Sequence, residues 1–257
     1  MSTTPTLKDS VQNQFNQAAA NYSTSPIHAI GADLAVMVEA AQLRGDEFLL
    51  DAGCGTGHTA LAFAPHVAQV VALDLSASML DQGRKLAEQR NITNIEFRQG
   101  DVEKLIDAYA SFDLITTRYS AHHWPNPQTA LAEFRRVLRP TGRLLVGDIV
   151  SSSDYTIDTH FQTIELLRDP SHVRDHTVDQ WLEYLDHAGF QADVAHTWEV
   201  YIDFASWIQR IHTPAPNAAM IRTILSQAPR EVQSALKVQP DSSFTMQAAL
   251  LRGLPRV

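Results

Sequence analysis

The sequence predicts an α/β fold built on a doubly wound, mostly parallel sheet. From residue 47 onward, short apolar runs alternate with amphipathic stretches, which is the pattern of strands and helices in successive βα units. Five such runs precede residue 151, and a glycine-rich turn joins the first run to the helix that follows it. The 257 residues contain no internal repeat, low-complexity tract or long linker. We therefore expect residues 1–257 to form one domain.

The segment before the sheet, residues 1–45, predicts a helical cap. Residues 8–20 are polar and rich in Gln, Asn and Ala. In the stretch that follows, apolar side chains recur at intervals of three or four residues, which gives a helix a single apolar face. These side chains are Ile27, Ile30, Leu34 and Val38.

The core of the sheet is predicted within residues 46–150. Its strands are expected at residues 48–51, 70–74, 95–99, 112–117 and 144–150. The helix before the last of these carries Leu131, Phe134 and Leu138 on one side. Pro140 and Gly142 predict a turn directly after that helix.

Residues 151–190 predict an insertion after the fifth strand, with two helices and the polar segment 168–176 between them. Thr177 and Gln180 have capping-box spacing at the start of the second helix, and Gly189 predicts its end. In the last part, residues 191–257, strand patterns near 190–202 and 243–251 flank helical segments. These two strands are expected to complete a seven-stranded sheet as an antiparallel hairpin at its edge.

Composition narrows the classes of partner. Twenty Lys and Arg against 29 Asp and Glu give a formal net charge of −9, which disfavours nucleic acids and anionic membranes. The single cysteine, Cys54, excludes an intrachain disulfide and a cysteine-based zinc site. Because no signal-peptide pattern and no run of membrane-spanning length occurs, we expect a cytoplasmic protein without membrane insertion. Assembly into a homo-oligomer is compatible with the sequence.

A glycine-rich turn lies between the first strand and its helix. Its glycines are Gly53, Gly55 and Gly57. Glycine permits a tight turn and lets a ligand come close to the backbone, and the following helix offers free N–H groups. Taken alone, such a turn is also found as a purely structural βα connection.

Three successive strands end in an aspartate, namely Asp51, Asp74 and Asp101. Open α/β sheets bind ligands at the carboxyl ends of their strands, so these carboxylates are predicted to face one site. Asp74 is at the position from which a carboxylate accepts hydrogen bonds from both hydroxyls of a ribose. One aspartate could be a helix cap, but three at successive strand ends favour a ligand site.

The charge of this edge favours a cationic nucleoside over a dinucleotide. A pyrophosphate beside Asp51 would be repelled, whereas the ammonium and sulfonium groups of S-adenosylmethionine would be attracted. The Gly-x-Gly-x-Gly spacing also differs from that of dinucleotide sites, and the Lys and Ser/Thr of a phosphate-binding loop are absent. We therefore expect S-adenosyl-L-methionine as the cofactor and S-adenosyl-L-homocysteine as the product.

The chain resembles the class I S-adenosylmethionine-dependent methyltransferases, because four motifs of that family occur in the family's order. They lie at residues 49–57, 71–76, 100–102 and 112–115. Through residues 133–142 the sequence is similar to the ubiquinone/menaquinone-biosynthesis-like subgroup. The resemblance covers residues 47–150. It implies a Rossmann-like methyltransferase that transfers a methyl group to an O-, N- or C-nucleophile of a small-molecule acceptor by in-line displacement.

The resemblance also implies roles for individual residues. Asp51 and the glycine turn would receive the methionine part, near backbone contacts from Arg118, and Asp74 would bind the ribose. The other implied cofactor contacts are Asp101 and Val102 at the adenine, Leu75 and Met79 as walls of the base, and Tyr22 from an N-terminal segment that folds over the cofactor. A structural alternative for Tyr22 is packing of the cap onto the core.

Two adjacent histidines, His122 and His123, follow the fourth strand and are the candidate catalytic residues. At the ligand edge an imidazole can accept a proton near neutral pH, if the acceptor requires a base. The alternative is that the pair shapes the turn. Trp124 is expected either to line the acceptor pocket or to pack that turn.

A metal site is not expected in the insertion, although His172 and His176 have i, i+4 spacing. The glutamate of the His-Glu-x-x-His motif is absent and Pro170 opposes a helix through the segment. Residues 168–174 resemble a segment after the fifth strand in some of these methyltransferases, which implies a role as a lid or in acceptor binding.

Two other function classes stay open: a noncatalytic adenosyl-ligand-binding protein and a nicotinamide-dependent oxidoreductase. Methylation of nucleic-acid bases is disfavoured further, because residues 116–119 read Thr-Thr-Arg-Tyr in place of an Asn/Asp-Pro-Pro-aromatic motif. The acceptor pocket is expected to form from the cap, residues 151–190 and residues 203–240. No motif in those segments identifies the acceptor.

Overall fold

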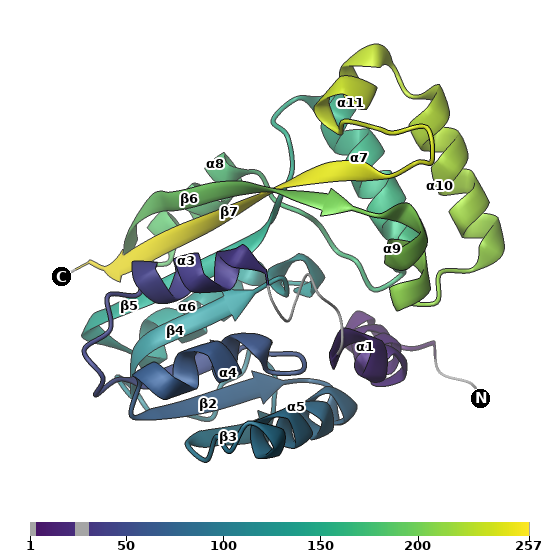
Figure 1. Cartoon of the computed structure of the whole chain (residues 1–257). Helices are drawn as coiled ribbons and strands as arrows, with labels where there is room; N and C mark the ends of the chain where they lie inside the picture. The colour runs from purple at the N-terminus through teal and green to yellow at the C-terminus, as the bar shows by residue number, and fades with distance from the viewer. Residues whose placement is uncertain (1–3, 24–30, 257) are drawn as a thin grey trace.

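A computed structural model of the chain describes residues 4–23 and 31–256, and its centre is a seven-stranded sheet (Figure 1). The strand order is β3-β2-β1-β4-β5-β7-β6. The strands are β1 Phe48–Ala52, β2 Gln69–Asp74, β3 Ile95–Gln99, β4 Phe112–Arg118, β5 Leu138–Val150, β6 Phe190–Ile202 and β7 Phe244–Pro255. β1 to β5 pair in parallel, and β7 runs antiparallel between β5 and β6. The predicted doubly wound sheet with an antiparallel edge hairpin is confirmed.

The strand order determines where a ligand can bind. β1 pairs with β2 on one side and with β4 on the other, and the chain passes from β3 back across to β4. Connections therefore leave β1 and β4 in opposite directions, which opens a crevice at their carboxyl ends. In Figure 1, helix α1 (Leu7–Ser23) lies beyond the tips of these strands.

Helices cover both faces of the sheet because strand side chains alternate in direction. The other helices are α3 Ala32–Ala40, α4 His58–Phe63, α5 Ala77–Gln89, α6 Pro127–Val137, α7 Tyr155–Arg168, α8 Val178–His187, α9 Phe204–Arg210, α10 Ala215–Gln227 and α11 Arg230–Ala235. One buried face, packed with residues of α3 and α4, contains Leu49, Leu114, Leu145 and Leu250. The opposite face, packed with residues of α6 and α8, contains Leu50, Ile115, Leu144 and Leu251.

The N-terminal cap consists of α1 and α3. The first of these begins one residue before the predicted stretch 8–20 and ends three residues after it. On α3, Leu34 is buried and Val38 is half-buried, as an inward apolar face requires. The predicted residues Ile27 and Ile30 lie outside the described residues.

The predicted start and end of α8 are both confirmed. The Thr177 hydroxyl accepts a hydrogen bond from the backbone N–H of Gln180, and the Gln180 side chain accepts one from the backbone N–H of Thr177. This reciprocal pair satisfies two N–H groups that a helix start leaves without partners. Gly189 follows the helix with φ +87°, a conformation that costs glycine least.

The insertion after β5 and the C-terminal helices build a separate apolar core beside the sheet. α7, α9, α10 and α11 stand together at the upper right of Figure 1, where the β6–β7 hairpin reaches them. Their shared core includes Ile149, Phe161, Trp207, Ile221 and Phe244. None of the helices in the described ranges is long and apolar enough to cross a membrane.

The turn predicted at Pro140 and Gly142 is wrong, because β5 begins at Leu138, directly after α6. Leu138 pairs with Phe112, and the register then shifts by several residues before the ladder resumes. The extra residues are therefore absorbed as an irregularity inside the strand, where proline and glycine are both tolerated. A Cβ on Gly142 would come within 2.9 Å of the carbonyl oxygen of Asp113.

Candidate active site

A cavity of about 920 Å³, the first cavity, lies at the carboxyl ends of the parallel strands. Its wall contains nine of the predicted cofactor residues: Tyr22, Gly53, Gly55, Asp74, Leu75, Met79, Asp101, Val102 and Arg118. α1 closes it from outside with Lys8, Val11 and Phe15. Asp51 and Gly57 are not part of the wall.

The glycine turn has the backbone shape that its sequence predicts. Gly53, Gly55 and Gly57 have φ values of +69°, +53° and +78°. The backbone N–H groups of Gly53 and Cys54 both donate to the carbonyl of Leu73, which ties the turn to β2. A Cβ on Gly55 would have no atom within 4 Å, so the backbone there borders open space. A side chain at this position would enter the cavity.

Asp51 lies beneath the turn. Its carboxylate accepts hydrogen bonds from the backbone N–H of Ala60 and the hydroxyl of Thr116, both at 3.0 Å. Burial raises the pKa of this carboxyl to about 7. In this position it joins β1 to α4 and β4, and so fixes the two sides of the crevice.

Asp74 ends β2 within the cavity wall. One of its oxygens accepts from the backbone N–H of Gly55 at 2.8 Å and the other from that of Ser76, also at 2.8 Å. Each oxygen retains a lone pair for a ligand hydroxyl. Burial raises the pKa of Asp74, while the two backbone donors favour its charged form.

Lys8 of α1 lies over the end of the cavity that Asp101 borders. Its ammonium is 2.6 Å from a carboxylate oxygen of Asp101 and 2.7 Å from one of Glu103. Further along α1, the Gln12 amide donates to the carbonyl of Leu75. α1 is thus joined to the loops after β2 and β3 and forms the outer wall of the cavity.

On the opposite side, Arg118 at the end of β4 forms a buried ion pair with Asp33 of α3. Its guanidinium also lies over the ring of Tyr119, 4.6 Å from the ring centre. The arginine therefore connects the cap to the sheet beside the cavity.

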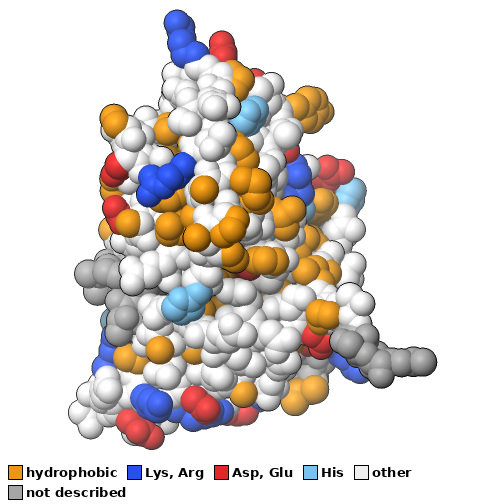
Figure 2. All heavy atoms as spheres, turned by 90° about the vertical axis from the view of Figure 1, so that its right-hand side faces the viewer, with side chains coloured by type: hydrophobic (Ala, Val, Ile, Leu, Met, Phe, Trp, Pro, Cys, Tyr) orange, Lys and Arg blue, Asp and Glu red, His pale blue; other side chains and the backbone are white. Residues whose placement is uncertain are grey.

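A second cavity of about 570 Å³ adjoins the first. Phe15, Tyr22, Tyr119 and His123 line both cavities, so these four side chains form the wall between them. The rest of the second cavity comes from β5, α7, α9 and the β6–β7 hairpin, together with His122 after β4 and Asp175 after α7. On the side of the molecule where α1 lies, hydrophobic side chains gather across the upper middle of the surface (Figure 2).

His122 lines only the second cavity and is paired with a carboxylate behind it. Its Nδ1 is 2.8 Å from Asp148, a residue of β5 that also accepts the backbone N–H of Ala121. Burial alone would lower the pKa of His122, but the Asp148 carboxylate outweighs it and raises the pKa to about 9. At neutral pH His122 is therefore a cation.

His123 has the opposite environment, although its ring is only 4.4 Å from that of His122. Burial and the neighbouring His122 cation both hold the pKa of His123 well below its usual range. Its Nδ1 is 3.1 Å from the carbonyl of Ser171. Because a carbonyl only accepts, we infer that Nδ1 carries the proton and that Nε2 has the free lone pair.

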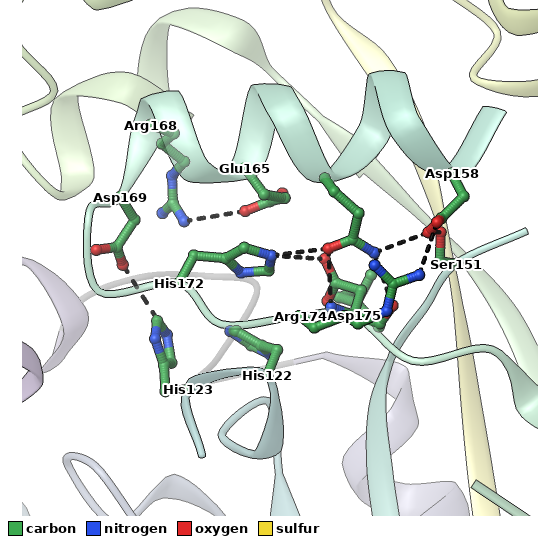
Figure 3. Close-up of polar contacts among 12 residues, drawn as sticks. His122, His123, Ser151, Asp158, Glu165, Arg168, Asp169, His172, Arg174 and Asp175 are labelled. Atoms are coloured by element: carbon green, nitrogen blue, oxygen red, sulfur yellow. Dashed lines mark hydrogen bonds and ion pairs between the residues drawn. The ribbon is translucent and has the colours of Figure 1, made fainter. Parts of the chain in front are cut away.

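The segment after α7 holds both histidines in place. Its backbone N–H groups at Val173 and Arg174 donate to the carbonyl of His122. Figure 3 shows Glu165 and Arg168 on α7 paired with each other, His172 between α7 and His122, and Asp169 beside His123. The distance between Asp169 and Nε2 of His123 is 3.9 Å. His172 instead contacts the amide oxygen of Gln162 at 3.0 Å.

Several side chains of the second cavity were not singled out from the sequence. They are Glu165, Trp207, Arg210 and Met246, together with Asp148 behind His122, whereas Arg168 lies in residues 168–174, for which a role as a lid or in acceptor binding is expected. Asp148 offered a signal, because it is a charged residue inside an apolar strand run and close to the strand's carboxyl end. The others come from segments far apart in the chain, and no local pattern joins them.

Comparison with known proteins agrees with this geometry. The methyltransferase domain family matches residues 50–146. A methyltransferase of Bacillus subtilis without an assigned substrate, YcgJ, is 33% identical over 250 residues, which are 95% of this chain and 99% of the relative. Its crystal structure superimposes with a TM-score of 0.84 over 87% of this chain and 98% of that one.

Two further relatives extend the comparison. A Bacillus halodurans protein with a provisional methyltransferase name is 31% identical and has a TM-score of 0.84, covering 88% of this chain and all of its own. A ubiquinone biosynthesis O-methyltransferase of Coxiella burnetii is 29% identical over 69% of this chain and 77% of the relative. The chain therefore belongs to the class I S-adenosylmethionine-dependent methyltransferases.

Proposed function

We propose that this methyltransferase binds S-adenosylmethionine in the first cavity and methylates a small molecule in the second, with His123 as the proton acceptor. The shared wall is the observation that carries the proposal, because Phe15, Tyr22, Tyr119 and His123 border both cavities. Displacement at a methyl group needs donor and nucleophile to meet in line, in a space from which water is excluded. The cofactor supplies the activated methyl group.

The residues of the first cavity suit an adenosyl ligand. The open space above Gly55 admits a ligand close to the backbone, and Asp74 has two oxygens oriented by backbone donors. The Asp74 carboxylate matches the two hydroxyls of a ribose. Asp51, beneath the turn, would act through the shape of the turn and through its charge.

His123 and His122 would have different roles in methyl transfer. His123, neutral at physiological pH, can take the proton that an O–H or N–H nucleophile loses, and Asp169 lies near enough to stabilise the resulting cation. His122, kept charged by Asp148, would be a positioning residue whose charge keeps its neighbour neutral. A nucleophile that ionises unaided would need neither histidine.

The test begins with calorimetric titration of the cofactor. Tight binding of S-adenosylmethionine but not of a nicotinamide dinucleotide is expected, and the reverse would identify an oxidoreductase. An acceptor screen that measures release of S-adenosylhomocysteine follows. Binding without turnover across phenols, amines, acids and activated carbon compounds would instead support a noncatalytic binding protein.

A further inference from the structure

The second cavity combines an apolar wall with two arginines. We call the side chains Ile149, Val200, Ile202, Trp207 and Met246 the apolar wall. Arg168, at the end of α7, and Arg210, at the end of α9, line the same space. The chain as a whole carries a formal charge of −9, so this pair is a local exception to its composition.

Arg168 is held in a fixed position. It is buried, its Nε donates to the carbonyl of Trp207, and its guanidinium lies 4.9 Å from the centre of the Trp207 ring. The nearest carboxylate oxygen, on Glu165, is 3.8 Å away, which is longer than a hydrogen bond. A guanidinium has five N–H donors; the Trp207 carbonyl accepts from one and the Tyr22 side chain forms a further hydrogen bond, so Arg168 retains donors for a ligand.

Arg210 is half-buried, and in the part of the chain that the structure describes no carboxylate oxygen comes within 4.0 Å of it. Trp207 and Arg210 are three residues apart on α9 and share a face of that helix. Because Arg168 stacks on Trp207, both guanidinium groups approach the same part of the cavity. Burial, together with the nearby Arg168, lowers the pKa of Arg210.

Two acidic side chains share the second cavity with the arginines. Glu165 and Asp175 line it, and burial raises the pKa of both, that of Asp175 well above its ordinary value. His122 adds a further cation, whose partner Asp148 lies outside the lining. Bringing two guanidinium groups together away from water is unfavourable, and an anion that contacts both reduces this cost.

We propose that the methyl acceptor is an organic anion whose carboxylate or phosphate is bound by Arg168 and Arg210 and whose apolar body packs against the apolar wall. This inference rests on the proposed function, because it takes the second cavity as the acceptor site. Guanidinium groups bind both anions through paired N–H donors, so the experiment must separate carboxylate from phosphate.

The test measures binding and needs no turnover. Calorimetric titrations in the presence of S-adenosylhomocysteine compare 4-hydroxybenzoate, its uncharged amide and phenyl phosphate, on the wild type, Arg210→Gln and Arg168→Gln. The control is Arg230→Gln, which removes the same charge from an exposed arginine at the start of α11 that does not line the cavity. Binding of S-adenosylhomocysteine reports whether each variant is folded.

We expect one of the two anionic probes to bind the wild type more tightly than the amide does. Binding of 4-hydroxybenzoate would identify a carboxylate as the bound anion, and binding of phenyl phosphate would identify a phosphate. Arg210→Gln and Arg168→Gln should each weaken that probe about tenfold or more, with the amide unchanged. Arg230→Gln should match the wild type. The proposal is overturned if the amide binds as tightly as both anions, if no anion binds at millimolar concentration, or if Arg210→Gln binds like Arg230→Gln.

This outcome is separate from that of the proposed function. Methyl transfer to uncharged acceptors that is insensitive to Arg210→Gln would keep the proposed function and reject an anionic acceptor. Charge-dependent binding of an anion without any methyl transfer would keep the anion-binding role of Arg168 and Arg210 and reject the proposed function.

Discussion

Replacing His122 by Gln tests the charge state on which the assignment of the two histidines depends. In the wild type, the Asp148 carboxylate raises the pKa of His122 from 6.5 to about 9. A group whose pKa is raised on folding contributes its stability fully below the unfolded value, and loses it as pH rises through the folded value. The wild type should therefore lose stability between about pH 6.5 and pH 9 at this residue.

The pKa change gives the size of the effect. At 1.36 kcal/mol per pH unit, the difference between 6.5 and about 9 corresponds to about 3 kcal/mol of unfolding free energy. Only 16% of the His122 side chain and 2% of the Asp148 side chain are exposed, so solvent screens the pair little. Gln keeps a donor for Asp148 but cannot be charged, and should remove most of this amount below pH 6.5.

The assay is urea unfolding from pH 6 to pH 10, because urea adds no ions that would screen the pair. The difference in unfolding free energy between wild type and His122→Gln should be largest at pH 6 and should shrink between about pH 6.5 and pH 9. Asp51, whose pKa burial raises to about 7, is present in both proteins and cancels in the difference. His187→Gln, an exposed site in the last turn of α8, is the control.

Parallel curves for wild type and His122→Gln across this range would refute the reasoning. They would mean that His122 is neutral in the folded protein, or that its charge has no folded partner. The argument that His122 keeps His123 neutral would then fail as well.

Three further predictions concern the cofactor and the proton. Asp74→Ala should weaken S-adenosylmethionine binding at least about tenfold in calorimetry, because charge-assisted hydrogen bonds are lost; unchanged affinity in a folded variant would remove the ribose assignment. Gly55→Val should abolish cofactor binding while the circular dichroism spectrum is retained, because the new side chain would enter the open space of the cavity and would be strained at φ +53°. Normal binding would mean that the turn is only a structural connection. His123→Gln should slow methyl transfer by ~10²–10⁴ while the affinity for the cofactor stays unchanged. The pH profile of the wild-type rate should show no ionisation near pH 6.5, because the pKa of His123 is lowered. If the variant turns over as fast as the wild type, His123 is not the base.

Local sequence patterns predicted most of the sheet and part of the wall of the first cavity. The β6 strand has the predicted bounds, and nine of the predicted cofactor residues line one cavity, because glycine turns and strand-end aspartates are local signals. Pro140 and Gly142 were misread because they carry the same signal in a turn and in a strand irregularity. Only the pairing of Leu138 with Phe112 distinguishes the two.

The second cavity could not be predicted in the same way. It unites Phe15, Arg168, Arg210 and Met246, which are distant in the chain and meet only when the β6–β7 hairpin carries its helices over α7. Nor does the sequence reveal that His122 and His123 differ in charge. That difference depends on Asp148, which is adjacent in the folded sheet and 26 residues away in the chain.

Helix α1 contributes Phe15 and Tyr22 to both cavities, so a single element controls entry to the two compartments. If the two cavities hold cofactor and acceptor as proposed, the demethylated cofactor and the methylated product would both leave past this helix, which the ion pairs of Lys8 with Asp101 and Glu103 attach to the loop after β3. Salt weakens partly exposed ion pairs of this kind, so the salt concentration of the medium would then affect turnover without acting on the chemical step.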